Sequence, residues 1–68
     1  MNNQYTVTIL DSDTYIEREV SVISETAQSA HKNTLWGINY QSETITKIVN
    51  DMGHVVYSIN DGFLKFIN

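Results

Sequence analysis

The chain has 68 residues, with eight acidic and four basic side chains, no cysteine and a formal net charge of −4. This length allows one compact domain over residues 1–68, which buries only about 60% of its unfolded surface and is expected to be marginally stable without a partner. The lack of cysteine excludes disulfides, and the lack of a basic patch argues against direct binding of DNA or RNA, because nothing neutralises the phosphates.

The first two predicted elements are strands that form an antiparallel hairpin. YTVTIL at 5–10 alternates apolar and polar residues, DSDT at 11–14 supplies turn chemistry, and YIEREVSVI at 15–23 resumes the alternation. The alternation places Ile16, Val20 and Val22 on one side of the second strand, interrupted by Arg18, and Tyr15, Glu17, Glu19 and Ser21 on the other.

The period then changes to that of a helix in SETAQSAHKNTLWG at 24–37. Ser24 is the expected N-cap, Glu25 complements the helix N-terminus, and Gly37 is expected to end the helix in a left-handed conformation. Small residues form a stripe at helical spacing, which predicts close packing of about three turns against a sheet: Ala27, Ala30, His31, Thr34 and Leu35.

Residues 43–52 fit either a helix or a strand. Ile45, Ile48, Val49 and Met52 lie at helical spacing, but most residues of this stretch are β-branched, which favours a strand. NDMG and NDG supply turns for two hairpins. We therefore expect three further strands, and an α+β fold in which one helix packs on an antiparallel sheet of about five strands in the order ββαβββ.

The last two predicted strands carry apolar residues on both sides. Val55, Tyr57 and Ile59 oppose Val56, and Phe63 and Ile67 oppose Leu64 and Phe66. One short helix covers only part of one sheet face. Either the sheet twists around the helix and leaves a few apolar groups exposed, or an apolar patch or free edge meets a second protein chain. We favour the second interpretation.

The sequence contains no signature of catalysis, of a cofactor or of a metal site. His31 and His54 lack partners at metal-ligand spacing, and His31 is expected to be a packed side chain. DSDTYIE resembles the start of a calcium loop, but Ile16 stands where the loop needs glycine and Val22 where it needs glutamate. Neither a nucleophile elbow nor a phosphate-binding glycine loop is present. We therefore expect a protein that is not an enzyme.

Aromatic and acidic residues are the candidates for partner binding. Trp36 either plugs the open end of the core or anchors a partner, since Trp and Tyr are enriched in interface hot spots. Tyr15 with Glu17 and Glu19 would form an outward strip able to engage Lys and Arg of another protein. The full set of candidates is Asp11, Asp13, Tyr15, Glu17, Glu19, Trp36 and Tyr40.

The termini and the hydropathy predict a cytoplasmic protein that does not enter the membrane. MNNQYTVTIL lacks the basic start, the apolar run and the cleavage site of a signal peptide. Apolar runs stay far below the roughly 20 residues that a membrane span requires.

In layout the whole chain resembles the small accessory proteins of phages and other mobile elements, including anti-CRISPR inhibitors. It is short, acidic and free of cysteine, with a YTVTIL…YIEREVSVI hairpin, a helix in SETAQSAHKNTLW and a closing ITKIVNDMGHVVYSI meander. The resemblance implies a protein, acting in the host cytoplasm, that binds a host complex and occludes its nucleic-acid or effector site. It carries over no individual residues, and acidic residues are too sparse here to imitate a phosphate array. The alternative function is a structural subunit that assembles as a homodimer.

Overall fold

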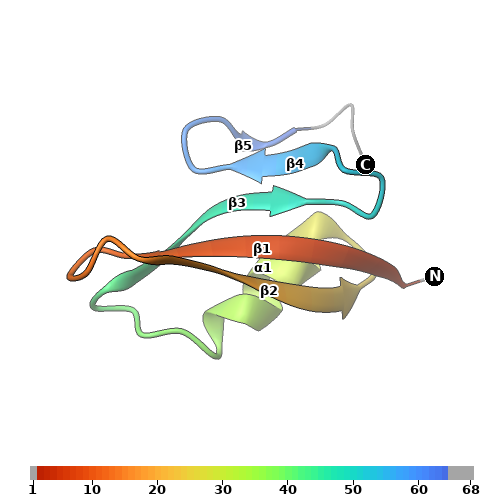
Figure 1. Cartoon of the computed structure of the whole chain (residues 1–68). Coiled ribbons are helices and arrows are strands. Elements are labelled where there is room, and N and C mark those ends of the chain that lie inside the picture. The colour runs from red at the N-terminus through yellow and green to blue at the C-terminus, as the bar shows by residue number, and fades with distance from the viewer. Residues whose placement is uncertain (1, 65–68) are drawn as a thin grey trace.

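The computed structural model describes residues 2–64, which form a five-stranded antiparallel sheet and one helix (Figure 1). The elements are β1 (Asn3–Asp11), β2 (Glu17–Ser24), α1 (Ala27–Leu35), β3 (Glu43–Val49), β4 (Val55–Ser58) and β5 (Gly62–Phe63). The predicted α+β fold and the order ββαβββ are therefore confirmed.

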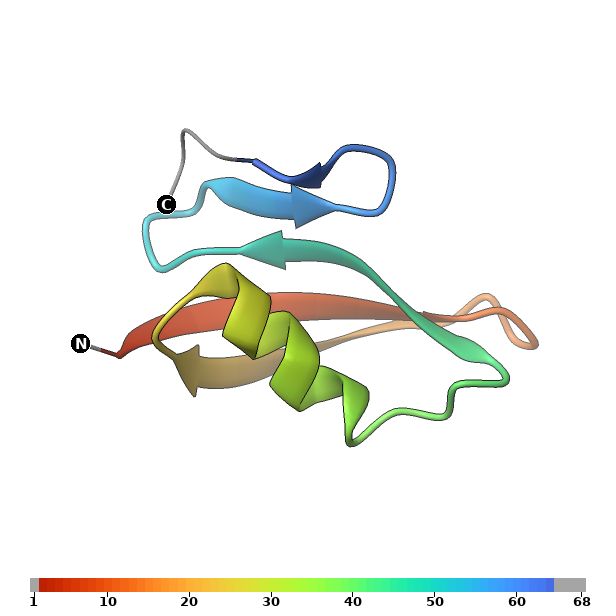
Figure 2. The same cartoon turned by 180° about the vertical axis from the view of Figure 1, so that it is seen from behind.

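The strand order in the sheet is β2-β1-β3-β4-β5, so the N-terminal strand lies inside the sheet and is paired on both sides. The β1–β3 register shifts after Thr8, which marks a bulge. The helix α1 crosses one face over β1, β2 and β3, while β4 and β5 lie beyond it (Figure 2). Within residues 2–64, β2 and β5 are the two edge strands.

The core lies between α1 and the face of the sheet that the helix covers. Ala27 and Ala30 are completely buried, because side chains this small allow the helix to approach the strands closely. The sheet contributes large side chains to the same cluster, which are Tyr5, Val7, Ile9, Ile45, Ile48 and Val56. The predicted small-residue stripe is thus confirmed as the packing face of α1.

Both ends of α1 differ from the prediction. Ser24 is the last residue of β2, and the N-cap is Thr26, whose Oγ1 accepts a hydrogen bond from the Ser29 N–H at 3.1 Å. Ser24 has a different role, because its hydroxyl is hydrogen-bonded to that of Ser29. The C-cap is Trp36 in a right-handed conformation, so the expected left-handed end at Gly37 is wrong.

The ambiguous residues 43–52 form strand β3 and a turn, as the β-branched residues predicted. The NDMG turn closes with a hydrogen bond from the Gly53 N–H to the Asn50 carbonyl at 3.1 Å, and Gly53 has φ 83°. Gly62 of the NDG turn has φ 73°. Both turns need glycine because other L-residues are strained at positive φ.

The face of the sheet turned away from α1 is mainly polar over β1, β2 and β3, as the alternation in the first two strands predicted. Three apolar residues lie on this face, Leu10, Ile23 and Val49, and Ile23 is 69% exposed. The polar residues on it are Gln4, Thr6, Thr8, Glu17, Glu19, Ser21, Thr44 and Lys47. Thr8 is buried, and its hydroxyl finds no partner among the described residues. The alternation expected through Lys65, Phe66 and Ile67 lies outside the described residues.

Candidate protein-binding surface

Local hydrogen bonds shape the tip of the β1–β2 hairpin. The Asp11 N–H donates to the Ile16 carbonyl at 3.0 Å, and the Tyr15 N–H donates to the Asp11 carbonyl at 2.7 Å. The Asp11 carboxylate accepts from the Asp13 N–H at 2.8 Å. Asp11 is therefore committed to holding the turn, whereas Asp13 is exposed and free to face a partner.

Tyr15 occupies the strained position of this turn. It has φ 59°, and it is the only residue other than glycine with positive φ in the described part of the chain. Its side chain is 81% exposed, so almost no packing within the domain compensates for this conformation. Tyr15 precedes β2, and the prediction that it continues the strand is wrong, because the chain must turn there to close the hairpin.

Glu17 and Glu19 form the acidic part of the predicted strip. Both are exposed on β2 and lie opposite Leu10 and Thr8 of β1. Arg18 points to the helix side, so alternation directs the two glutamates to the other face of the sheet. The only ion pair within residues 2–64 joins Arg18 to Glu43, which leaves both glutamates without a cation there.

Glu43 ties the hairpin to the loop that follows α1. Its carboxylate accepts from the Asn39 N–H at 2.9 Å and from the Arg18 Nε at 3.1 Å. These two interactions, the backbone bond first, hold the pKa of the carboxyl below its usual value. The Ser12 N–H also donates to the Ser42 carbonyl at 2.7 Å. The two loops are therefore fastened together at one end of the molecule.

This fastening brings the β1–β2 turn and the loop between α1 and β3, which contain most of the predicted partner-binding residues, to the same end of the molecule (Figure 1). Tyr40, 69% exposed, lies in the loop that Glu43 and Ser42 hold beside the hairpin. We use the name hairpin surface for Asp13, Tyr15, Glu17, Glu19 and Tyr40. Sequence reasoning overlooked Arg18 and Glu43, whose pairing positions it, although the break that Arg18 makes in an apolar strand face was a signal.

Trp36 does not join the hairpin surface. It caps the C-terminus of α1, on the side of the sheet opposite the two glutamates, and is 79% exposed. The interpretation that Trp36 plugs the core is therefore wrong. An α-helix has about 3.6 residues per turn, so Trp36 faces away from the packing side that Thr34 occupies two residues earlier.

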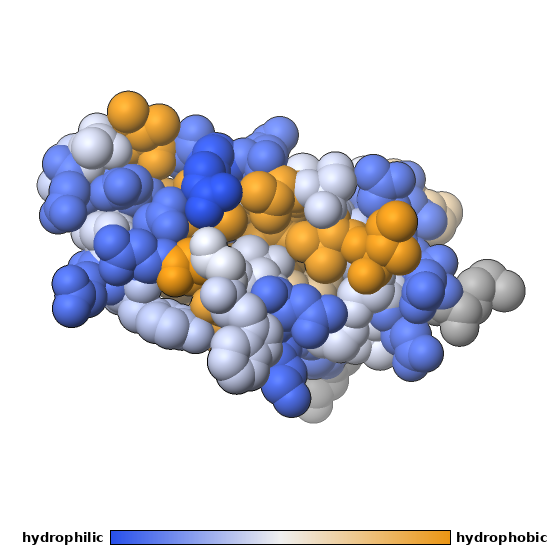
Figure 3. Space-filling model, turned by 90° about the horizontal axis from the view of Figure 1, so that it is seen from below, coloured by the Kyte–Doolittle hydropathy of each residue, from blue (hydrophilic) through white to orange (hydrophobic). Residues whose placement is uncertain are grey.

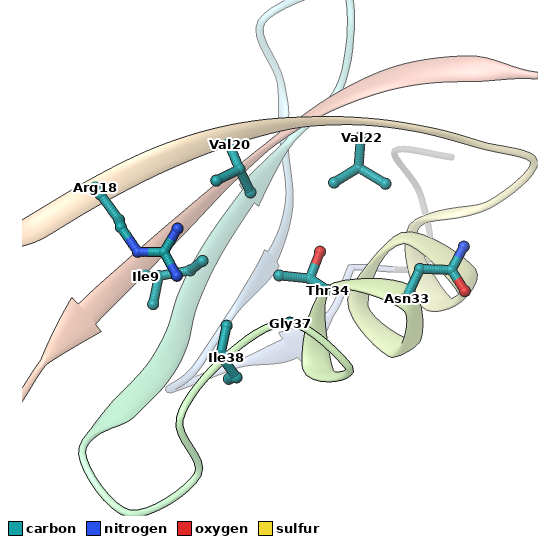
Figure 4. Close-up of a pocket in the computed structure, with 8 residues that line it drawn as sticks. All are labelled: Ile9, Arg18, Val20, Val22, Asn33, Thr34, Gly37 and Ile38. Carbon is teal, nitrogen blue, oxygen red and sulfur yellow. The ribbon is translucent and has the colours of Figure 1, made fainter.

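A groove opens between β2 and the C-terminal part of α1. Side chains from both elements and from the following loop line it, and its volume is about 190 Å³ (Figure 4). Val20 and Val22 of β2 point into it opposite Thr34 and Ile38, with Arg18 at one end. Seen from the side of β2, hydrophobic surface runs along the middle of the molecule between hydrophilic margins (Figure 3). The groove runs beside the free edge of β2.

His31 is a packed side chain, as expected. Its ring lies 4.9 Å from that of Tyr57 and 5.7 Å from that of Phe63, both with edge-on geometry. These contacts extend the packed core from α1 to β4 and β5. Burial lowers the pKa of His31, because desolvation disfavours the charged ring.

This lowered pKa predicts loss of stability in mild acid. As the pH falls, His31 takes up a proton in the unfolded chain at a higher pH than in the folded chain. The free energy of unfolding therefore decreases below about pH 6.5, as the pH drops toward the pKa of the folded state. We expect a lower melting temperature at about pH 5 than at about pH 7.5. His31→Phe should reduce this difference, whereas replacing the exposed His54 with Gln should retain it. Equal pH dependence in wild type and His31→Phe would contradict the assignment.

Other kinds of site find little support in the described part of the chain. No group of three or more His, Cys, Asp or Glu side chains among residues 2–64 could hold a metal ion. The one helix of that segment is too short and too polar to cross a membrane. Comparison of the chain with protein-family models, curated proteins and solved structures found no match.

Proposed function

We propose that the chain is a non-enzymatic protein-binding module that occludes a basic site on a nucleic-acid-handling or defence complex of a host cell, as small phage inhibitors do. The observation that carries this proposal is Tyr15, held in a strained conformation with its ring in solvent. Strain of this kind is retained where the surroundings or a function require it. The exposed ring makes little packing contact within the domain, so a contact with a partner protein would explain why a tyrosine stands at this position.

The charges of the hairpin surface indicate the chemistry of the partner. Asp13, Glu17 and Glu19 are exposed, and Arg18, which lies between the two glutamates in the chain, is engaged by Glu43. Lys47 lies beyond Thr8 on the same sheet face as Glu19 and forms no ion pair within residues 2–64. Exposed carboxylates and exposed tyrosine rings in the same part of the molecule suit a surface rich in Lys and Arg, since complementary charge steers association and aromatic side chains anchor it. Surfaces that grip nucleic acid have this basic character.

The test is quantitative affinity capture from host lysate, read by mass spectrometry. The double variant Glu17→Lys, Glu19→Lys reverses the charge of the strip. We expect it to capture at least about tenfold less partner than the wild type. The matched control is Asp51→Lys with Asp61→Lys, which makes the same charge change at two exposed turn positions away from the hairpin. The control should retain the partner, and added DNA or RNA should compete with capture by the wild type.

Equal capture by wild type and strip variant would remove the acidic strip from the function. A partner that nucleic acid does not displace would overturn the occlusion part of the proposal. A second candidate function, a self-assembling subunit, is favoured by the free edge of β2. Light scattering on the purified chain separates the two, because a monomer leaves that edge to a foreign partner.

A further inference from the structure

Within residues 2–64, the backbone groups on the outer side of β2 have no hydrogen-bond partner. The hydrogen bond from the Asp11 N–H to the Ile16 carbonyl sets the phase of the β1–β2 ladder, because bonded and non-bonded pairs alternate in an antiparallel pair. The N–H and C=O groups of Arg18, Val20 and Val22 therefore point to β1. Those of four other residues point away from the sheet, where residues 2–64 supply no partner, namely Glu17, Glu19, Ser21 and Ile23.

The groove lies on the helix side of this edge. A strand added to β2 would place every second side chain on that side, beside Val20 and Val22 and facing Thr34 and Ile38. The lining is mainly aliphatic, so an aliphatic side chain fits there and would cover hydrophobic surface now open to water (Figures 3 and 4).

The other side chains of an added strand would lie on the face that carries Glu17 and Glu19. Cross-strand neighbours on one face approach to about 5 Å, close enough for oppositely charged pairs to stabilise the sheet. Arg18 cannot supply that charge, because it lies on the helix side and is bound to Glu43. Lys or Arg at two alternate positions of the added strand would neutralise both glutamates.

We infer that the edge of β2 binds an extended segment of the partner as an added strand, and that this segment alternates basic and aliphatic residues. The backbone groups of β2 give affinity, the groove selects the aliphatic residues, and Glu17 and Glu19 select the basic ones. The inference rests on the proposed function, since it defines the partner's chemistry beside the same hairpin surface.

A second copy of the chain would leave the charges of Glu17 and Glu19 at this edge uncompensated. In any antiparallel pairing of β2 with itself, Glu17 and Glu19 meet only residues 17–24 of the other copy. The one basic residue of that segment, Arg18, has its side chain on the opposite face. Both glutamates of each copy would therefore stay without a cation across the new ladder, whereas a basic strand neutralises them.

The test uses the whole chain and a labelled peptide as long as β2, with Lys and Val alternating over 8 residues. Fluorescence anisotropy should show binding at least about tenfold tighter than for a peptide of the same composition with its lysines and valines in separate blocks. Ser21→Pro removes an outward N–H without touching the β1 ladder, and a strand tolerates proline in that orientation. Ser21→Pro should abolish the binding, and Ser21→Thr should retain it.

If Ser21→Pro does not fold, the wild type is titrated with two peptides methylated on alternate sets of amide nitrogens. In an added strand, every second N–H points to β2 and donates to it, and the others point away. The peptide methylated on the outward N–H set should bind, and the peptide methylated on the set that faces β2 should not. Equal binding of both, or of the alternating and block peptides, overturns the inference. A wild-type dimer that Ser21→Pro converts to monomer also overturns it, because a second copy then holds the edge.

The same variants separate this inference from the proposed function. If host partner capture is lost with the Glu17→Lys, Glu19→Lys variant but kept with Ser21→Pro, the hairpin surface binds the partner without strand addition. If neither variant loses the partner, both proposals fail.

Discussion

Ile48→Ala is expected to remove a large part of the stability of the fold. Ile48 is completely buried in the middle of β3, between Val7 of β1 and Tyr57 of β4 in the sheet. Removing a buried isoleucine to alanine costs about 2–5 kcal/mol. A domain of this length has a total stability of only about 3–10 kcal/mol, so this one loss consumes much of it.

Urea denaturation followed by far-UV circular dichroism measures this effect. Trp36 is a poor fluorescent probe of unfolding here, because it is already exposed in the folded chain. The matched control is Ile48→Val, which removes one methylene and should cost about 0.5–1.5 kcal/mol. A midpoint for Ile48→Ala equal to that of Ile48→Val would contradict the position of this side chain in the core.

Tyr15→Gly is expected to stabilise the fold and to weaken partner binding. Glycine adopts φ 59° without the cost of about 1–2 kcal/mol that a left-handed conformation imposes on other residues, while its greater freedom in the unfolded chain cancels part of that gain. The net increase in unfolding free energy should be about 0.5–1 kcal/mol. The lost ring was exposed, so little burial is lost with it.

The two effects are read in parallel, by urea denaturation and by capture of the host partner. Removal of a tyrosine at an interface hot spot costs about 2 kcal/mol or more, which corresponds to at least about a thirtyfold loss of affinity. Tyr40→Asn is the control, because it removes an exposed ring from a residue without positive φ and should not stabilise the fold. Tyr15→Gly with unchanged partner capture would remove the observation on which the proposed function rests.

The opposite signs of these effects distinguish a binding residue from a structural one. A residue that only closes the hairpin would lose stability and binding together when replaced. The carboxylate of Asp11 is such a residue, since it accepts the Asp13 N–H inside the turn and is less available to a partner. The three predicted binding residues of the β1–β2 turn thus divide into Asp11, which shapes the turn, and Asp13 and Tyr15, which the turn presents to solvent.

The sequence by itself determined the elements of this fold, because the signals for them are local. Alternation in YTVTIL and YIEREVSVI predicted the hairpin, and the small residues around Ala30 predicted the packing face of α1. Gly53 and Gly62 lie in the predicted turns at positive φ. The β-branched residues of the ambiguous stretch 43–52 predicted a strand, which is β3, because their side chains suit a strand better than a helix.

Only the tertiary structure decided where the candidate site lies and what supports it. The pairing of β1 with β3 brings Glu43 to Arg18 across 25 positions of the chain, and no local pattern contains that contact. The same pairing places β1 inside the sheet and leaves β2 at its edge beside a groove, where its outer backbone groups find no partner in the part of the chain that the structure describes. Strand periodicity states which residues share a face, but neighbours across a sheet depend on which distant segments pair, and that is settled by packing of the whole chain.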